Sequence, residues 1–238
     1  MRTYKVKSGS FTEHPYYTPK EVEQICTDEL RSVDLFPLQP EPIRIERFIE
    51  KRFKVTPTYE ELPEGFLGFT EFGQKGVKGI GISKLLVDEG NKVSERRINT
   101  TLAHEAGHGL LHAHLFVVGQ QPHLLFGEGI DSNKPKILCR NDTIQGLKSY
   151  RNIGYNGCWW EYQANLAIGS LLLPRSLAMV AMEPFLIEEG IMGIYRLDGS
   201  RQEEAIKTLA QVFDVNPIVA KIRVEALLPN SQNKQLTI

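Results

Sequence analysis

The chain has 238 residues, which is enough to bury a sizeable core without disulfides or a structural metal and suits one large domain, or one domain with a small appendage. Hydrophobic residues make up 41% and charged residues 24%, proportions that exclude a wholly disordered protein. The 28 basic and 29 acidic side chains give a net charge of -1, which excludes a protein that binds nucleic acid through an overall basic surface.

Two amphipathic helices are predicted near the N-terminus. Thr18 supplies a capping hydroxyl, Pro19 takes the first helical position and Glu21 follows three residues after the cap, so the first helix should begin there. Apolar residues then recur at spacings of three and four as far as Val33. After a proline-rich break, the same periodicity predicts a second helix over residues 45–53.

Two strands and a third helix are predicted next. Residues 66–72 and 77–87 are rich in β-branched and aromatic residues and are separated by a glycine-containing turn, which predicts a hairpin or two strands of a short antiparallel or mixed sheet. The strand at 79–83 is a candidate edge for the addition of an extended peptide. Ser94 can cap a third helix that runs to about Leu115.

The second half of the chain combines an irregular segment with further helices. Residues 116–157 contain glycine and proline, show little periodicity and are long for an unstructured loop, so we expect a lid or an elaborated insertion. A strongly apolar helix is predicted from about Trp159 to Leu173, where Pro174 stops it. Two short helices and a polar tail from Asn230 close the chain.

The third predicted helix contains an HExxH pattern, His104-Glu105-Ala106-Gly107-His108. Histidines four residues apart project from one face of a helix and can share a zinc ion, and the glutamate between them then lies beside an open coordination position. The alternative is a pair of solvent-exposed helix histidines. The position of the motif, on a capped helix that follows strand-like segments, favours the metal site.

A catalytic zinc needs a third protein ligand, and Glu161 at the start of the apolar helix is the candidate. A carboxylate beside Trp159 and Trp160 is costly to bury without a cation or hydrogen-bond donors. If Glu161 is instead exposed, it complements the helix dipole in the first turn and needs no metal. Asn165, one turn later, could orient a ligand histidine through its second ring nitrogen.

These residues resemble the active-site region of the ImmA/IrrE family of metallopeptidases. That family combines a TLAHE-x-GH segment, here Thr101 to His108, with a downstream E-x-x-A-N on an apolar helix, here Glu161 to Asn165. A leucine-rich turn ending in proline follows, here Leu171 to Pro174. The resemblance is specific over about residues 100–175 and weak at both ends of the chain.

The resemblance implies a small zincin-like α+β metallopeptidase domain, which we place at residues 1–195. Its insertion at about 116–157 is longer than in the compact members of the family. The implied activity is that of a zinc-dependent hydrolase that cleaves a protein or peptide, for example a helix-turn-helix repressor. The site residues that it implies are the zinc ligands His104, His108 and Glu161 and the catalytic base Glu105.

Other residues near the motif are weaker candidates. A metzincin-like site would use His114 as the third ligand, but that pattern has glycine where this chain has Leu111, so we expect the helix to continue past the site. Cys139 and Cys158 could serve as thiolate ligands, although free cysteine is more often a small buried hydrophobe. Candidate hydrogen-bond donors to an oxyanion, which spacing cannot rank, are Tyr155, Tyr162 and His123.

The end of the chain is similar to a helix-turn-helix. Residues 202–213 and 217–228 predict two short helices around a tight turn, so we assign 196–238 to a C-terminal helical appendage. The second helix offers few cations, Lys221 and Arg223, for contacts with phosphates, and nucleic acid is therefore not an expected partner. The alternatives to the peptidase are a DNA-binding or regulatory protein with a structural zinc site, and an interaction module that keeps the metal without turnover.

The cysteines and the apolar runs bear on location. The 3 cysteines are widely spaced and include no CxxC pair, which argues against a secreted disulfide framework and against a four-cysteine zinc site. The first residues lack the apolar core of a signal peptide, and no stretch approaches the roughly 18 apolar residues of a membrane span. We therefore expect a cytoplasmic protein with no membrane partner.

Overall fold

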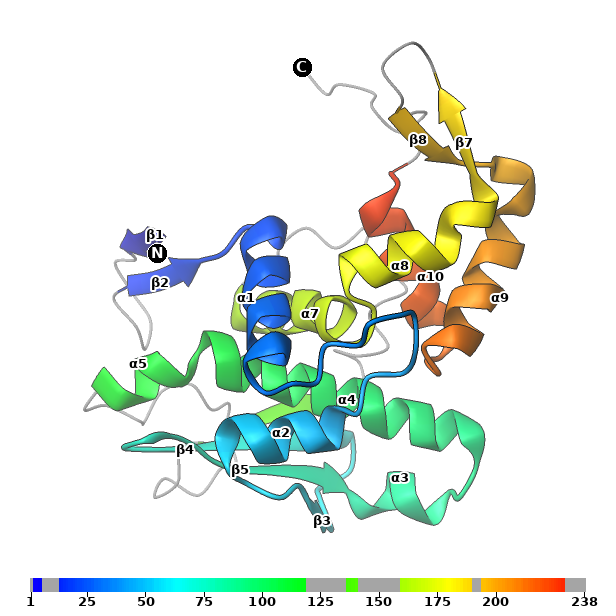
Figure 1. Ribbon diagram of the computed structural model, residues 1–238. Helices are drawn as coiled ribbons and strands as arrows, with labels where there is room; N and C mark the ends of the chain where they lie inside the picture. The colour runs from blue at the N-terminus through cyan, green and yellow to red at the C-terminus, as the bar shows by residue number, and fades with distance from the viewer. Residues whose placement is uncertain (1, 6–12, 119–135, 141–158, 190–193, 230–238) are drawn as a thin grey trace.

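The computed structural model describes residues 2–5, 13–118, 136–140, 159–189 and 194–229 and has the expected α+β fold (Figure 1). The helices are α1 (Pro19–Ser32), α2 (Ile45–Phe53), α3 (Lys84–Asp88), α4 (Lys92–Leu111), α5 (Ala113–Val118), α7 (Trp159–Leu172), α8 (Arg175–Met182), α9 (Gln202–Val212) and α10 (Pro217–Leu227). The strands are β1 (Arg2–Lys5), β2 (Glu13–Tyr16), β3 (Thr58–Glu60), β4 (Phe66–Gly73), β5 (Gly76–Ser83), β6 (Lys136–Arg140), β7 (Leu186–Glu189) and β8 (Ile194–Leu197).

The central sheet is mixed and has the strand order β3-β5-β4-β6. β4 and β5 form the predicted antiparallel hairpin, β6 pairs antiparallel with the other side of β4, and β3 pairs parallel with β5. The expectation that residues 79–83 form a sheet edge holds only in part. Gly81 and Ile82 have β3 on one side and β4 on the other, whereas the pairs that Gly79 and Ile80 make in the described sheet are with β4 alone. Within the described residues, β3 and β6 are the outer strands of this sheet.

The predicted start of α1 and the predicted end of α7 hold to within one residue. Thr18 and Glu21 form a reciprocal capping box at the start of α1, as predicted, with Pro19 in the first turn. α7 ends at Leu172, and Pro174 then serves as the residue before α8, a helix that the sequence analysis did not predict. Most of the predicted insertion, 119–135 and 141–157, lies outside the described residues.

The core is organised in layers around α4. Figure 1 shows α4 lying between the sheet on one side and α7 with α1 on the other, and α4 packs against β4, β5 and α7. Because neighbours cover both of its sides, the segment from Thr100 to Gly109 is buried, including its polar residues. No single helix among the described residues has both the length and the hydropathy of a membrane span. The helical segments Trp159–Leu172 and Arg175–Phe185 reach that length and hydropathy only when taken together, and they are bent by 56° relative to each other.

The C-terminal helices share this core. The two predicted helices are present as α9 and α10, and buried residues such as Leu209 and Val224 belong to the same hydrophobic cluster as Leu102 of α4. The boundary assigned between 195 and 196 falls inside β8, which pairs with β7 in a two-stranded sheet. The separate domain thus stays a prediction, while the shared core is a feature of the structure.

A buried ion pair connects α1, near the start of the chain, with α10, near its end. Arg223 of α10 is 7% exposed; its Nη2 lies 2.6 Å from Glu23 of α1, and its Nε donates to the Leu173 carbonyl at 2.8 Å. Glu23 also accepts hydrogen bonds from the Ser170 hydroxyl at 3.0 Å and from the backbone N–H of Arg175 at 2.6 Å. One carboxylate therefore links α1, α7, α8 and α10.

Arg223→Lys is expected to lower the free energy of unfolding by about 1–3 kcal/mol, since a single ammonium cannot bind both the Leu173 carbonyl and Glu23 in the geometry of a guanidinium. Chemical denaturation followed by circular dichroism measures this. Arg44→Lys, at an exposed position next to α2, is the matched control and should change stability by no more than roughly 0.5 kcal/mol. Equal stability of the two variants would contradict the role assigned to Arg223.

Candidate metal centre

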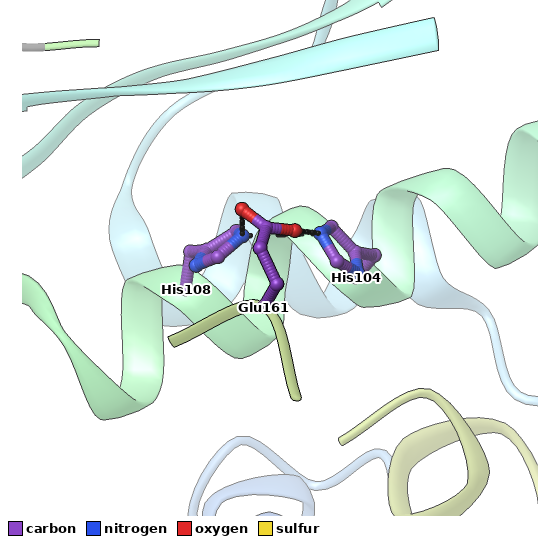
Figure 2. Close-up of side chains that lie close together, drawn as sticks. All are labelled: His104, His108 and Glu161. Carbon is purple, nitrogen blue, oxygen red and sulfur yellow. Dashed lines mark hydrogen bonds and ion pairs between the residues drawn. The ribbon is translucent and has the colours of Figure 1, made fainter. Parts of the chain in front are cut away.

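The structure brings together His104, His108 and Glu161, the three residues proposed as metal ligands. His104 Nε2 lies 3.1 Å from Glu161 Oε2, and His108 Nε2 lies 3.5 Å from Glu161 Oε1. The two histidine Nε2 atoms are 3.0 Å apart. Figure 2 shows the carboxylate of Glu161 facing both imidazoles across one turn of α4. The histidine side chains are fully buried and their donor atoms and that of Glu161 lie within 4.8 Å of one another, so this group can hold a metal ion.

A glycine inside the motif allows the two helices that carry these residues to approach. A Cβ atom at Gly107 would lie 2.8 Å from the Cβ of Ala167 and 3.1 Å from the carbonyl oxygen of Ala164, both on α7. Those distances are too short for a side chain, so the close contact between α4 and α7 requires glycine. This contact positions Glu161 opposite the histidines.

The N-terminus of α4 is capped one turn earlier than predicted. Asn91, not Ser94, is the cap: its Oδ1 accepts from the backbone N–H groups of Val93 and Ser94. Ser94 completes the capping box by accepting from the Asn91 backbone N–H at 3.1 Å. Both residues are good caps in sequence, but only Asn91 lies outside the helix.

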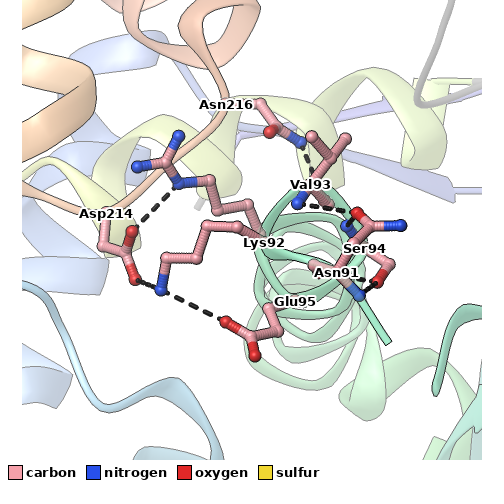
Figure 3. Close-up of polar contacts among 8 residues, drawn as sticks. Asn91, Lys92, Val93, Ser94, Glu95, Asp214 and Asn216 are labelled. Carbon is pink, nitrogen blue, oxygen red and sulfur yellow. Dashed lines mark hydrogen bonds and ion pairs between the residues drawn. The ribbon is translucent and has the colours of Figure 1, made fainter. Parts of the chain in front are cut away.

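The turn between α9 and α10 also contacts this end of α4 (Figure 3). Asp214 binds Lys92 Nζ at 2.7 Å and Arg96 Nε at 2.9 Å, and Asn216 donates to the Val93 carbonyl at 3.5 Å. Asp214 has a positive φ of 50°, a left-handed conformation that aspartate tolerates better than most residues. The C-terminal helices therefore help to fix the helix that carries the HExxH motif.

Glu105 lies beside the donor group without being part of the His104, His108 and Glu161 set. Its side chain is buried, Thr70 Oγ1 of β4 donates to its Oε2 at 2.6 Å, and its Oε1 has no hydrogen-bond partner in the described part of the chain. A Cβ at Gly68 would lie 3.2 Å from that Oε1, so glycine keeps β4 clear of it. Burial raises the pKa of Glu105 to about 8, against the lowering effects of His104 and Thr70. Thus Oε2 of this carboxylate is held by Thr70, and Oε1 is available to accept a hydrogen bond or a proton.

The ionisation of the ligand candidates suits cation binding. Burial opposes ionisation of Glu161, but His108 and His104 outweigh it and hold the pKa of that carboxyl well below its usual range. Burial lowers the pKa of His108, which favours the neutral ring that coordinates metals. At His104, burial acts in the same direction but is outweighed by Cys139 and Glu161, so its pKa is raised. A bound cation would displace the proton from this ring.

Each of the two candidate histidine ligands also has a hydrogen-bond partner for its other ring nitrogen. His104 Nδ1 lies 3.0 Å from Asn165 Oδ1, the contact predicted from the sequence. His108 Nδ1 lies 3.0 Å from His112 Nδ1, and His112 Nε2 lies 3.0 Å from Gln163 Oε1. The sequence analysis assigned no role to His112 or Gln163. The one available signal was that His112 continues the four-residue spacing of the motif.

The remaining candidates from the sequence lie outside the group of His104, His108 and Glu161. α4 continues past His108, as expected, but ends at Leu111 rather than at about Leu115. His114 lies half-buried on α5, outside the ligand groups found among the described residues. Cys139 of β6 is buried and lies within 4.8 Å of donor atoms of His104 and Glu105. Burial raises the pKa of the Cys139 thiol to about 12, which disfavours a thiolate. Tyr162 is exposed, and outside the described residues lie Cys158, Tyr155 and His123.

Comparison with protein-family models and with curated proteins found no match. The donor set itself therefore carries the functional inference.

Proposed function

We propose that this chain is a cytoplasmic zinc-dependent metallo-endopeptidase that hydrolyses peptide bonds in a protein substrate. The observation that carries the proposal is the buried group of His104, His108 and Glu161 beside a carboxylate, Glu105, with one unpartnered oxygen. Two imidazole nitrogens and one carboxylate form the ligand set typical of zinc in metallopeptidases, whereas magnesium and calcium prefer all-oxygen sites. The donor chemistry thus fits zinc.

The residues around the site have separate roles in this proposal. When bound, zinc supplies a Lewis acid that polarises the scissile carbonyl and acidifies the attacking water. Glu105 accepts a proton from that water on Oε1 and passes it to the leaving amine. Thr70 holds Oε2 of the same carboxylate, which orients Oε1 toward the reacting atoms. His104, His108 and Glu161 provide the ligand shell.

An extended peptide would bind along β6 rather than along β5. β6 is an outer strand of the described sheet, and its residue Cys139 lies beside His104 and Glu105, so a strand added there runs past the site. The sequence resemblance to ImmA/IrrE metallopeptidases suggests a regulatory protein, such as a helix-turn-helix repressor, as the substrate.

The DNA-binding alternative is disfavoured by the environment of α10. Its residues Val219, Ala220 and Val224 are buried in the core, and Arg223 pairs with Glu23 inside the protein. Of the two cations that α10 could offer to phosphates, Lys221 is exposed and Arg223 is buried.

Chain purified without added zinc is expected to contain one zinc per molecule, because two histidines, a glutamate and one solvent position complete a tetrahedral shell. Metal analysis by mass spectrometry measures the stoichiometry, and the double variant His104→Ala/His108→Ala is the control that should lose the metal. Less than about a tenth of an equivalent in the wild type, not recovered after zinc is added, would remove the basis of the proposal.

A substrate can be sought by comparing the proteins of cells that carry the wild type with those of cells that carry Glu105→Gln. A protein that is cleaved only in the presence of the wild type is the candidate. Purified chain must then cleave the same bond in vitro and stop doing so when a chelator removes the metal.

A further inference from the structure

We infer that His112, Gln163 and the backbone carbonyl of Pro15 form a positioning chain that fixes the tautomer of His108 and directs its Nε2 lone pair at the metal site. The inference concerns how the site is kept ready for the ion, and it rests on the proposed function in taking His108 as a ligand. His112, Gln163 and Pro15 are all buried, so their polar atoms need partners within the protein.

The direction of the hydrogen bonds follows from the last member of the chain. The carbonyl oxygen of Pro15, on β2, can only accept, so the side-chain amide nitrogen of Gln163 must face it, at 2.9 Å. The amide oxygen of Gln163 is thereby turned toward His112 Nε2, at 3.0 Å. Because that oxygen can only accept, His112 must carry its proton on Nε2.

The same logic continues to the ligand. A neutral His112 with its proton on Nε2 has a lone pair on Nδ1, which lies 3.0 Å from His108 Nδ1. His108 must therefore donate from Nδ1, and its Nε2 keeps the lone pair. That Nε2 is the atom that lies 3.5 Å from Glu161 Oε1 and 3.0 Å from His104 Nε2, within the donor group.

The positioning chain accounts for two buried polar residues outside the HExxH motif: His112, one turn beyond it on α4, and Gln163 on α7. At His104, Asn165 performs the equivalent task in one step, since it contacts Nδ1 directly. At His108 the task requires a second histidine, an amide and a carbonyl that is 148 residues from the amide in sequence. The short N-terminal strand β2 therefore contributes to the orientation of a metal ligand.

Long-range ¹H–¹⁵N correlations of the histidine rings test the positioning chain directly. The full wild-type chain, stripped of metal and kept near pH 8, above the ordinary pKa of histidine, is expected to have His108 protonated on Nδ1 and His112 on Nε2. A proton on Nε2 of His108 or on Nδ1 of His112 would overturn the inference. This measurement does not depend on zinc or on activity. If the predicted tautomers are present but the protein binds no zinc, the inference about the positioning chain is supported and the proposed function fails.

Gln163→Met removes both hydrogen bonds with little change in volume. We expect it to abolish the single tautomer preference of His112 and to weaken zinc binding, measured by competition with a chelator, by about 10- to 100-fold. Gln211→Met, the same change at an exposed position of α9, should leave both readouts at wild-type values. A Gln163→Met chain that keeps the wild-type tautomers would contradict the inference, and thermal unfolding shows whether both variants are folded.

Discussion

Glu105→Gln is expected to retain zinc and a wild-type unfolding temperature while lowering the rate of peptide cleavage by about 10²- to 10⁴-fold, the usual contribution of a general base. The amide keeps an oxygen that can accept the hydrogen bond from Thr70, so the side chain should stay in place. Its nitrogen cannot take a proton from water. Zinc content, thermal unfolding and turnover on an identified substrate are the three measurements.

Glu95→Gln is the matched control for this variant, because Glu95 is an exposed glutamate on the same helix and pairs only with Lys92 among the contacts described. It should leave all three measurements unchanged. Full cleavage by Glu105→Gln would overturn the assignment of Glu105 as the base. Loss of zinc together with activity would instead indicate that Glu105 belongs to the metal shell.

Glu161→Ala is expected to weaken zinc binding by more than the roughly 10- to 100-fold that follows loss of an outer hydrogen-bond partner, because under the proposed function it removes a direct ligand. It also removes the carboxylate that faces both buried imidazoles. Competition with a chelator measures the affinity, and metal analysis measures the stoichiometry.

His114→Ala is the comparison for Glu161→Ala. His114 lies on α5, outside the ligand groups found in the described residues, so its removal should leave zinc content close to that of the wild type. Zinc retained by Glu161→Ala and lost by His114→Ala would reverse the ligand assignment and favour a metzincin-like shell.

The part of the site that the sequence predicted is the part that local geometry determines. The spacing of His104 and His108 places both on one face of α4 whatever the rest of the fold does. Asn165 was reached in the same way, as the residue one turn after Glu161. Glu161 itself lies on another helix, and it was identified through the cost of burying a carboxylate and through resemblance.

The partners of His108 could not be predicted, because they are joined by packing rather than by spacing. His112 and Gln163 are 51 residues apart, and Gln163 and Pro15 are 148 apart. β6 was missed for a related reason: its five residues, in a segment without clear periodicity, form a strand through pairing with β4. At the start of α4, two good capping residues stood three positions apart, and the sequence offered no means of choosing Asn91 over Ser94.

The ion pair between Glu23 and Arg223 has a consequence for how the chain is made. These residues are 200 positions apart, so during synthesis Glu23 leaves the ribosome long before its cation exists. Until α10 emerges, α1, α7 and α8 would enclose the Glu23 carboxylate without the Arg223 cation with which it pairs, and closing the core early is therefore unfavourable. We therefore expect the core, and with it the firm placement of α4, to be completed only after α10 has been synthesised.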